Sequence, residues 1–251
     1  MIEHVISDGV AVVTLNRPPV NAWDDDHLDQ FQDVLGQLES ADISVIVVRS
    51  ALYLFSAGAD LAAMHEKFQT ADGQAEMSIF VRHIQDAYAQ LESSTKVTIA
   101  EIGGAALGGG LELALACDLR IAANEAKLGL PEAGLGLLPG AGGTQRLPRM
   151  VGEGMAKRMI LGAEALSGEA AAQSGLVQWS VPRDELQAFT AATAQRIADL
   201  PRHAVALCKS CINDGLEATR DGYLSEREGS AVLFGHPATH AQVGKFLAGQ
   251  R

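Results

Sequence analysis

The sequence predicts an α/β protein with a helical C-terminal region. Residues 45–48 form a continuous apolar run, Val-Ile-Val-Val, which is typical of a parallel strand covered on both faces. A strand, a loop of small residues and a helix follow one another twice, over residues 45–61 and 97–117. After Met150 the sequence turns to alanine-rich segments with helical spacing. Strands that alternate with helices in this way favour a parallel sheet with helices packed against it.

The composition is that of a folded globular chain. Of its 251 residues 47% are hydrophobic and 20% are charged, which allows a sizeable core and excludes disorder as the main state. The 31 acidic residues outnumber the 19 basic ones, and the net charge of −12 makes nucleic acid an unexpected partner. The most apolar window, residues 105–117, contains Glu112 and three glycines and is too short to span a bilayer. We therefore expect no membrane partner.

The cysteine content and the N-terminal residues indicate the cellular compartment in which the protein is expected. The first residues show neither a signal-peptide nor a transit-peptide pattern. Three cysteines cannot form a disulfide framework and fit a reducing environment. These observations predict a cytoplasmic protein.

The N-terminal elements can be predicted one by one. Residues 2–6 and 10–15 flank an Asp-Gly turn, which predicts a β-hairpin. Three aspartates at 24–26 precede apolar residues at helical spacing up to Leu38, which predicts a helix with acidic residues at its positive end. Further predicted elements are a short helix from residue 61, a helix over 75–92, strands over 97–102 and 119–123, and a helix over 111–117 between them.

The C-terminal half is expected to be mostly helical. Helices are predicted near 153–162, 167–174, 184–200, 202–213 and 217–233, with one strand at 177–181. A boundary near Pro201 divides a core domain, residues 1–200, from a helical region, residues 201–251. Residues 65–80 are polar and contain Gly73, which suggests a mobile segment that forms one wall of a binding site rather than a packed helix or strand.

Two turns of small residues are candidates for an anion-binding or oxyanion-binding site. Backbone N–H groups at a helix start have no intrahelical partner, and a turn without bulky side chains leaves them accessible. If parallel strands set the two turns side by side, the N–H groups of Ala59 and Gly109 could reach one carbonyl oxygen. The alternative is that residues 103–110 only allow a helix and a strand to pack closely.

Two carboxylates lie in apolar surroundings. Glu112 follows three glycines in an apolar segment, and Glu132 follows Pro131 in another. Burial raises a carboxyl pKa toward neutrality, where the group can act as general acid or base. The alternative is that either glutamate is simply favoured by a helix N-terminus.

Other common catalytic and metal-binding motifs are either absent from the sequence or lack the partner residues that they need. The phosphate-loop motif, the dinucleotide-binding glycine pattern, the G-x-S-x-G elbow and the H-E-x-x-H motif are all absent. Cys208 and Cys211 match C-x-x-C but lie in a helical pattern, and His236 and His240 have no carboxylate pair nearby. We interpret these four residues as packing or surface residues and expect no metal site.

Taken together, four segments closely resemble the crotonase superfamily and, within it, the enoyl-CoA hydratases. They are Phe-Ser-Ala-Gly-Ala-Asp-Leu at 55–61, the glycine-rich run at 104–114, Leu-Pro-Glu at 130–132 and Pro-Gly-Ala-Gly-Gly-Thr-Gln-Arg-Leu at 139–147. The resemblance extends almost from end to end. It implies a crotonase-like spiral of ββα units with a helical C-terminal region, assembled as a homotrimer or a dimer of trimers. Residues 201–251 would then serve as a trimerisation or capping region.

The resemblance also implies roles for individual residues. The N–H groups of Ala59 and Gly109 would form the oxyanion hole for a thioester, and Glu112 and Glu132 would be the two catalytic glutamates. The implied substrate-binding residues are Ala57, Asp60, Leu61, Gly108, Pro131 and Gly140. Coenzyme A would be part of the substrate, with no separate cofactor.

The implied activity is the addition of water to trans-2-enoyl-CoA thioesters to give 3-hydroxyacyl-CoA, as in fatty-acid β-oxidation or related acyl-CoA degradation. One carboxylate would handle the water and the other would protonate C2. Enoyl-CoA isomerisation or another crotonase-type reaction is the alternative, and a non-catalytic acyl-CoA-binding subunit is a further one. Where many relatives carry a lysine for the coenzyme A phosphates this chain has Ala62, which leaves Arg17, Lys67 and Lys245 as candidate cations.

Overall fold

The computed structural model describes residues 1–249, and within them the main sheet has six strands in the order β1-β2-β3-β4-β6-β9. The strands are β1 (Ile2–Ser7), β2 (Val10–Leu15), β3 (Val45–Ser50), β4 (Val97–Ile102), β6 (Leu119–Ala123) and β9 (Trp179–Val181). Strands β1 and β2 are antiparallel, and all the other neighbours are parallel. The α/β prediction is therefore confirmed, including the hairpin, whose Asp8 and Gly9 have positive φ angles of 49° and 79°.

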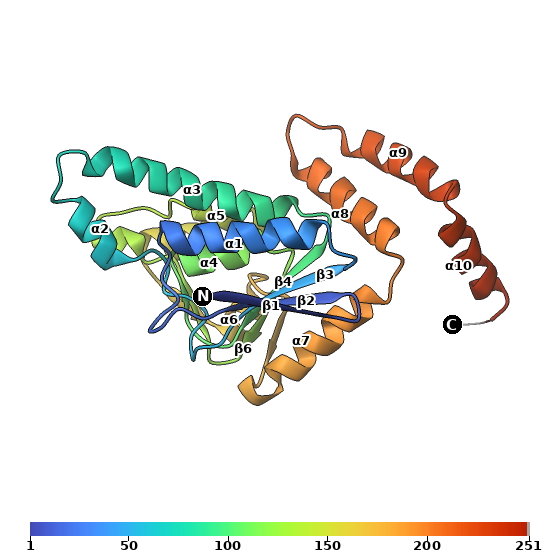
Figure 1. Cartoon of the computed structure of the whole chain (residues 1–251), viewed down its shortest axis with the longest axis horizontal. Helices are drawn as coiled ribbons and strands as arrows, with labels where there is room; N and C mark the ends of the chain where they lie inside the picture. Colours follow the sequence, from blue (N-terminus) through green and yellow to red (C-terminus); the bar gives the residue numbers. More distant parts are fainter. Residues whose placement is uncertain (250–251) are drawn as a thin grey trace.

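Helices cover both faces of this sheet (Figure 1). On one side lie α1 (Asp25–Glu39), α3 (Gly73–Ser93), α4 (Gly109–Ala116) and α5 (Gly143–Leu161), and on the other lies α7 (Arg183–Ala198). The α1 helix begins at the predicted place because the Asp24 side chain accepts a hydrogen bond from the His27 N–H, which is a standard N-cap. The continuous apolar run of β3 is buried, as expected for a strand between two helical layers.

A second, smaller sheet was missed by the sequence analysis. It consists of β5 (Ala106–Leu107), β7 (Lys127–Gly129) and β8 (Ala165–Ser167), in the order β5-β7-β8. Strands of two or three residues are too short to show an alternating hydrophobic pattern. This sheet matters for the site because β5 leads into the glycine-rich turn, where the Gly108 N–H donates to the carbonyl oxygen of Gly129, the last residue of β7, at 3.0 Å.

Three further expectations need correction. Residues 65–80 are largely helical: α2 (Leu61–Lys67) is followed by the first turns of α3, in which Gly73 and Phe80 are buried. The predicted helix at 153–162 is the second half of α5, which starts ten residues earlier and is interrupted at Gly152, where φ is 78° and ψ is 161°. Helix α10 (Pro237–Leu247) was not predicted, although a proline at the first helical position is a known start signal.

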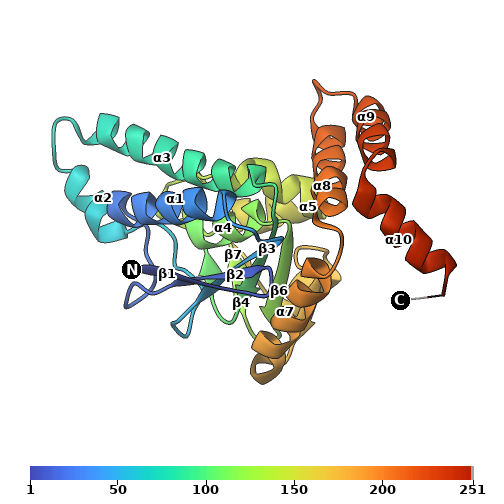
Figure 2. The ribbon, with the colours of Figure 1, turned by 45° about the vertical axis from the view of Figure 1, so that its right-hand side comes forward.

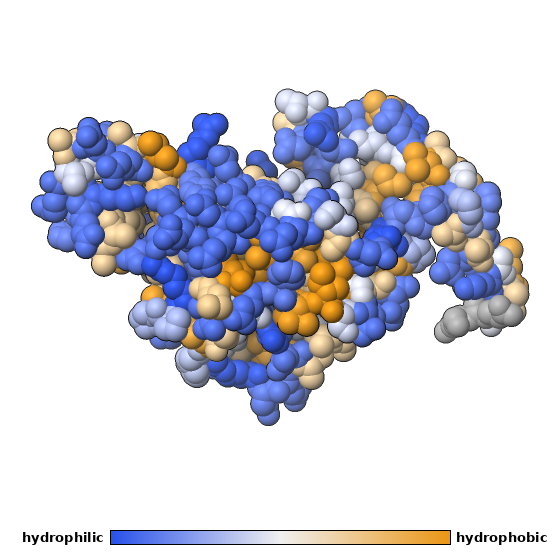
Figure 3. Space-filling view, in the orientation of Figure 1, coloured by the Kyte–Doolittle hydropathy of each residue, from blue (hydrophilic) through white to orange (hydrophobic). Residues whose placement is uncertain are grey.

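The remaining helices follow the predicted order. They are α6 (Gly168–Gln173), α8 (Arg202–Leu216) and α9 (Gly222–Phe234). Helices α9 and α10 extend away from the sheet, as the two ribbon views agree (Figures 1 and 2). Several large apolar side chains on them are exposed, and hydrophobic surface is visible there in Figure 3. These side chains are Tyr223, Val232, Phe234, Val243, Phe246 and Leu247.

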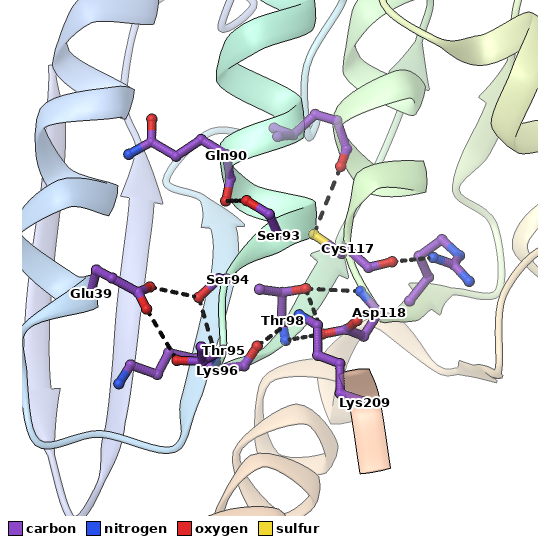
Figure 4. A network of polar contacts seen from close by, with 12 residues as sticks. Glu39, Gln90, Ser93, Ser94, Thr95, Lys96, Thr98, Cys117, Asp118 and Lys209 are labelled. Atoms are coloured by element: carbon purple, nitrogen blue, oxygen red, sulfur yellow. Dashed lines mark hydrogen bonds and ion pairs between the residues drawn. The ribbon is translucent and has the colours of Figure 1, made fainter. Parts of the chain in front are cut away.

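A polar network joins α8 to the sheet (Figure 4). The Lys209 ammonium group is 2.8 Å from Asp118 Oδ2 and 2.9 Å from the Lys96 carbonyl oxygen. The same Asp118 oxygen accepts hydrogen bonds from the N–H and the hydroxyl of Thr98 in β4. The Lys209 side chain is only 9% exposed, so this contact fixes α8 against the core.

Among the described residues, no helix combines the length and the apolar character that crossing a bilayer requires.

Candidate active site

Two turns meet at the carboxyl end of neighbouring parallel strands. One turn follows β3 and the other follows β4, and because these strands are parallel neighbours, both turns emerge at the same edge of the sheet. A short parallel bridge pairs Ser56 with Ala106, and the Leu107 N–H donates to the Ser56 carbonyl over 3.0 Å. The side-by-side placement that the sequence analysis needed is therefore present.

The small residues in the turns are required by the closeness of the two backbones. A Cβ on Gly110 would lie 2.3 Å from the Ser56 carbonyl oxygen, and one on Gly58 would lie 2.8 Å from the Gly109 nitrogen. Gly58 also has a φ of +92°, a conformation that other residues rarely adopt. These glycines therefore allow the close packing that brings the two backbone segments together.

The N–H groups of Ala59 and Gly109 are available at this junction. Within residues 1–249 neither N–H donates to a backbone acceptor, and a Cβ on Gly109 would lie 3.6 Å from the Ala59 nitrogen. Gly109 is the first residue of α4, so its N–H also lies at the positive end of a helix. Two adjacent donors of this kind can hold a carbonyl oxygen that becomes negative during a reaction.

Three buried polar side chains fix these turns, and the sequence analysis missed all three. The Asn21 amide donates to the Phe55 carbonyl oxygen at 2.9 Å, and the Ser56 hydroxyl donates to the Asn21 carbonyl at 2.8 Å. The Tyr88 hydroxyl donates to the Gly109 carbonyl oxygen at 2.8 Å. Of the three, only Tyr88 could have been recognised from the sequence. A tyrosine on the apolar face of a predicted helix is expected to be buried, and a buried hydroxyl needs a hydrogen-bond partner.

Glu112 projects from the first turns of α4 and is 2% exposed. Its Oε1 accepts hydrogen bonds from the N–H groups of Ala141 and Gly143, at 2.8 Å and 2.7 Å. Burial raises the pKa of Glu112 to about 7, although these hydrogen bonds act in the opposite direction; the charge of Glu132 raises it further. With Oε1 held by the backbone, Oε2 remains to interact with a ligand.

Glu132 begins a short 3-10 helix, η1 (Glu132–Leu135). Its Oε2 is buried and has no hydrogen-bond partner among the described residues, and a Cβ on Gly108 would lie 3.1 Å from its Oε1. Burial raises the pKa of Glu132 as well. A buried carboxyl oxygen without a partner is costly, which makes it a candidate for contact with a substrate.

One cavity of about 470 Å³ brings these groups together. It is lined by nine of the ten predicted site residues: Ala57, Ala59, Leu61, Gly108, Gly109, Glu112, Pro131, Glu132 and Gly140. The tenth, Asp60, lies in an adjacent hollow, where its carboxylate caps α2 by accepting from the Ala62 and Ala63 N–H groups.

Two of the three candidate cations for an anionic ligand already contact carboxylates. Arg17 contacts Asp24 and lies 3.4 Å from Asp60, beside the same hollow. Lys67 lies 3.3 Å from Asp25, and Lys245 is exposed on α10. Within residues 1–249 no group of three or more histidine, cysteine or acidic side chains is arranged to hold a metal ion.

Comparison with known proteins identifies the family. The family model described as enoyl-CoA hydratase/isomerase matches residues 5–247. The chain belongs to the enoyl-CoA hydratase/isomerase family, and the resemblance seen in the sequence is confirmed.

Individual relatives agree with this assignment. The chain is 40% identical over 219 residues to a short-chain-enoyl-CoA hydratase of Clostridium acetobutylicum, covering 86% of this chain and 82% of that protein. It is 39% identical, with the same coverage, to a crotonyl-CoA hydratase of Syntrophomonas wolfei.

Solved structures confirm the crotonase fold. DspI of Pseudomonas aeruginosa superposes with a TM-score of 0.92 at 38% identity, over 99% of this chain and 94% of that one. An enoyl-CoA hydratase of Bacillus anthracis superposes with a TM-score of 0.91 at 34% identity, over 99% and 96% of the two chains.

Proposed function

We propose that this protein adds water across the 2,3-double bond of trans-2-enoyl-CoA thioesters to give 3-hydroxyacyl-CoA. The observation that supports this most is that Glu112 and Glu132 line one cavity with Ala59 and Gly109, whose N–H groups have no backbone acceptor within residues 1–249. The family and the printed names of the relatives, short-chain-enoyl-CoA hydratase and crotonyl-CoA hydratase, support the same activity.

The proposed reaction starts with the thioester oxygen between the two N–H donors. Ionised Glu112 takes a proton from a water molecule through Oε2, and the water oxygen forms a bond to C3 as the double bond shifts toward the thioester. Negative charge then develops on the thioester oxygen, where Ala59 and Gly109 stabilise it; one such donor typically lowers a barrier by about 3 kcal/mol. Protonated Glu132 delivers its proton to C2. The C2–C3 π bond and one O–H bond of water are thereby broken, and one C–O and one C–H bond are formed. The proton that Glu112 took from water must return to Glu132, by way of solvent, before the next turnover.

The pKa of Glu112, raised to about 7, suits a base that is ionised at and above neutrality. Burial raises the pKa of Glu132 too, in the direction that favours its protonated, proton-donating form. The small residues at 57, 108 and 140, with Leu61 and Pro131, form the surrounding wall, and Asp60 and Arg17 border the adjacent hollow where the polar part of coenzyme A would begin. No cofactor beyond the coenzyme A of the substrate is required.

Enoyl-CoA isomerisation is the second candidate, because the family includes isomerases. A single carboxylate at the position of Glu132 could move a proton between C2 and C4. The buried Glu112, with its free Oε2, favours hydration because isomerisation gives this carboxylate no water to activate.

The experiment is the loss of conjugated-enoyl absorbance of crotonyl-CoA with the wild type, Glu112→Gln and Glu132→Gln. Glu125→Gln is the control, since this exposed glutamate lies outside the cavity. We expect hydration by the wild type and the control, and a loss of roughly a thousandfold or more in each of the two variants, both of which should still unfold cooperatively. A folded wild type that isomerises 3-enoyl-CoA but hydrates nothing would replace the proposal by the second candidate.

The helical region 201–251 is proposed to assemble the chain into a homotrimer or a dimer of trimers and to cap the core. The exposed apolar side chains on α9 and α10 support this, because large apolar surfaces mark interaction sites. Sedimentation velocity would distinguish the two assemblies. The three free cysteines support a reducing compartment, so we propose the cytoplasm as the location.

A further inference from the structure

The cavity has two chemically different ends. At one end lie Glu112 and Glu132 with the backbone of Gly109. Most of the remaining lining is apolar, and much of it comes from α2, α3 and the segment around η1. These elements contribute Met64, Phe68, Met77, Phe80, Leu135 and Leu138.

Helix α3 sets the length of this apolar part. A Cβ on Gly109 would lie 3.6 Å from Ile84 Cδ1, so Ile84 marks the level of the thioester carbonyl. Met77 lines the same cavity seven residues earlier on α3, which at 1.5 Å per residue is about 10 Å away along the helix axis. An extended alkyl chain advances about 1.3 Å per carbon, so about eight acyl carbons fit between these two levels.

A groove borders the cavity at Met77. It shares Phe68, Met77 and Val81 with the cavity and is also lined by Thr70 and Gln74. Phe68 is 53% exposed, so the side chain that stands between cavity and groove is held by few neighbours. Methionine is unbranched and adapts readily to its surroundings, which suits a boundary that lets a chain pass.

We propose that the enzyme prefers medium-chain 2-enoyl thioesters, of about eight to twelve carbons, over crotonyl thioesters, with Met77 and Phe68 as the residues that determine chain length. This inference rests on the proposed hydratase function. It separates this chain from the relatives whose names specify short-chain or crotonyl substrates. A four-carbon acyl group would leave the apolar part of the cavity empty and would gain nothing from it.

The test is the rate of hydration of trans-2-enoyl-CoA esters with 4, 6, 8, 10 and 12 carbons. We expect kcat/KM to rise by roughly tenfold or more from 4 to 10 carbons, since each buried methylene adds binding. Met77→Trp fills the far end and should lower the ratio of kcat/KM for 10 carbons to kcat/KM for 4 carbons roughly tenfold. Ile79→Trp is the matched control, because Ile79 lies on the same helix, is 68% exposed and lines none of these surfaces.

A second variant covers the case in which tryptophan disturbs the fold. Met77→Ala enlarges the far end and should shift the chain length of highest kcat/KM toward longer esters. A maximum at 4 carbons, or an equal effect of both variants on all lengths, would overturn the inference and leave the hydratase function intact.

Binding separates the two proposals if no ester is hydrated. Dissociation constants of butyryl-CoA and decanoyl-CoA, measured by calorimetry, should then still favour decanoyl-CoA by roughly tenfold. Tighter decanoyl binding without turnover would refute the hydratase function alone. Equal binding of the two esters would refute the chain-length inference too.

Discussion

The hydroxyl of Tyr88 on α3 donates a hydrogen bond of 2.8 Å to the carbonyl oxygen of Gly109, the first residue of α4. Both residues are buried. The N–H and the carbonyl of Gly109 belong to two peptide units that meet at its Cα, so anchoring the carbonyl at the start of α4 restricts the backbone that carries the N–H. The proposed oxyanion donor is therefore oriented by a side chain that lies outside the lining of the cavity.

Removing this hydroxyl should affect turnover more than substrate binding. For Tyr88→Phe we expect kcat to fall roughly tenfold with KM within about threefold, because the donor matters most when charge develops. Unfolding should be easier by about 1–3 kcal/mol, since the Gly109 carbonyl is left buried without its partner. Steady-state kinetics and denaturant unfolding measure both quantities, with Tyr223→Phe, a 78% exposed tyrosine, as control. Equal loss in both variants would refute the positioning role.

The two turns should not tolerate a side chain at Gly110. A Cβ there would lie 2.3 Å from the Ser56 carbonyl oxygen, so Gly110→Ala must separate the turns. We expect a loss of activity of roughly a hundredfold or more and destabilisation by about 1–3 kcal/mol. Gly154→Ala is the control, because a Cβ at Gly154 meets nothing within 4 Å, and it should be neutral or slightly stabilising. Full activity of Gly110→Ala would contradict the close approach.

The pH dependence of hydration should follow Glu112. Its pKa is raised to about 7 by burial, and as a base it must be ionised. The value of kcat/KM for crotonyl-CoA should therefore rise through about pH 7 and level off above it. An initial-rate series from pH 5.5 to 8.5 checks this, and a profile that falls through pH 7 would assign the acid role to Glu112 instead.

Glu112 should also make the protein less stable as the pH rises. Its pKa is higher in the folded state than the ordinary value of 4.5, so the folded state binds the proton more tightly. Stability is then greatest below pH 4.5 as far as this group is concerned, and decreases as the pH rises through about 7. Glu112→Gln keeps the acceptor for Ala141 and Gly143 and removes the charge. Its gain in Tm over the wild type should be larger at pH 8 than at pH 5, and the opposite order would exclude a raised pKa.

The contact of α8 with the sheet should depend on Lys209. Lys209→Met leaves the buried side of Asp118 without its cation, which should destabilise the protein by about 3 kcal/mol. Hydrogen exchange should show the largest loss of protection in α8. Lys157→Met removes an exposed ion pair with Glu153 and should change little. Unchanged protection of α8 in Lys209→Met would show that packing alone holds this helix.

The sequence predicted the elements whose pattern is long and regular. The apolar run of β3 and the spacing of apolar residues in α1 each reflect a surface that must be buried, and such burial produces a recognisable pattern of hydrophobic residues in the sequence. The short strand β5 and the interruption of α5 at Gly152 depend on tertiary contacts and on one backbone conformation, so neither has such a period.

For the candidate site the sequence indicated residue types but not their partners. The apolar neighbours of Glu112 predicted its burial, which the structure confirms at 2% exposure. That Ala141 and Gly143 donate to its Oε1 could not be predicted, because these residues lie about thirty positions away and meet it only after the sheet has formed. Two turns of small residues indicated that the N–H groups of Ala59 and Gly109 could reach one carbonyl oxygen, and the family resemblance added the proposal that this oxygen belongs to a thioester.

Met77 and Tyr88 lie on one uninterrupted helix of 21 residues, α3. A rigid helix moves as a body, so a displacement at the end that borders the acyl groove is transmitted to the end that holds Gly109. The proposed chain-length preference and the proposed oxyanion donor therefore both depend on the position of α3. If evolution changed the groove for another substrate, α3 would shift, and we expect the substitutions that restore the position of Gly109 to occur near Tyr88 rather than at the glutamates.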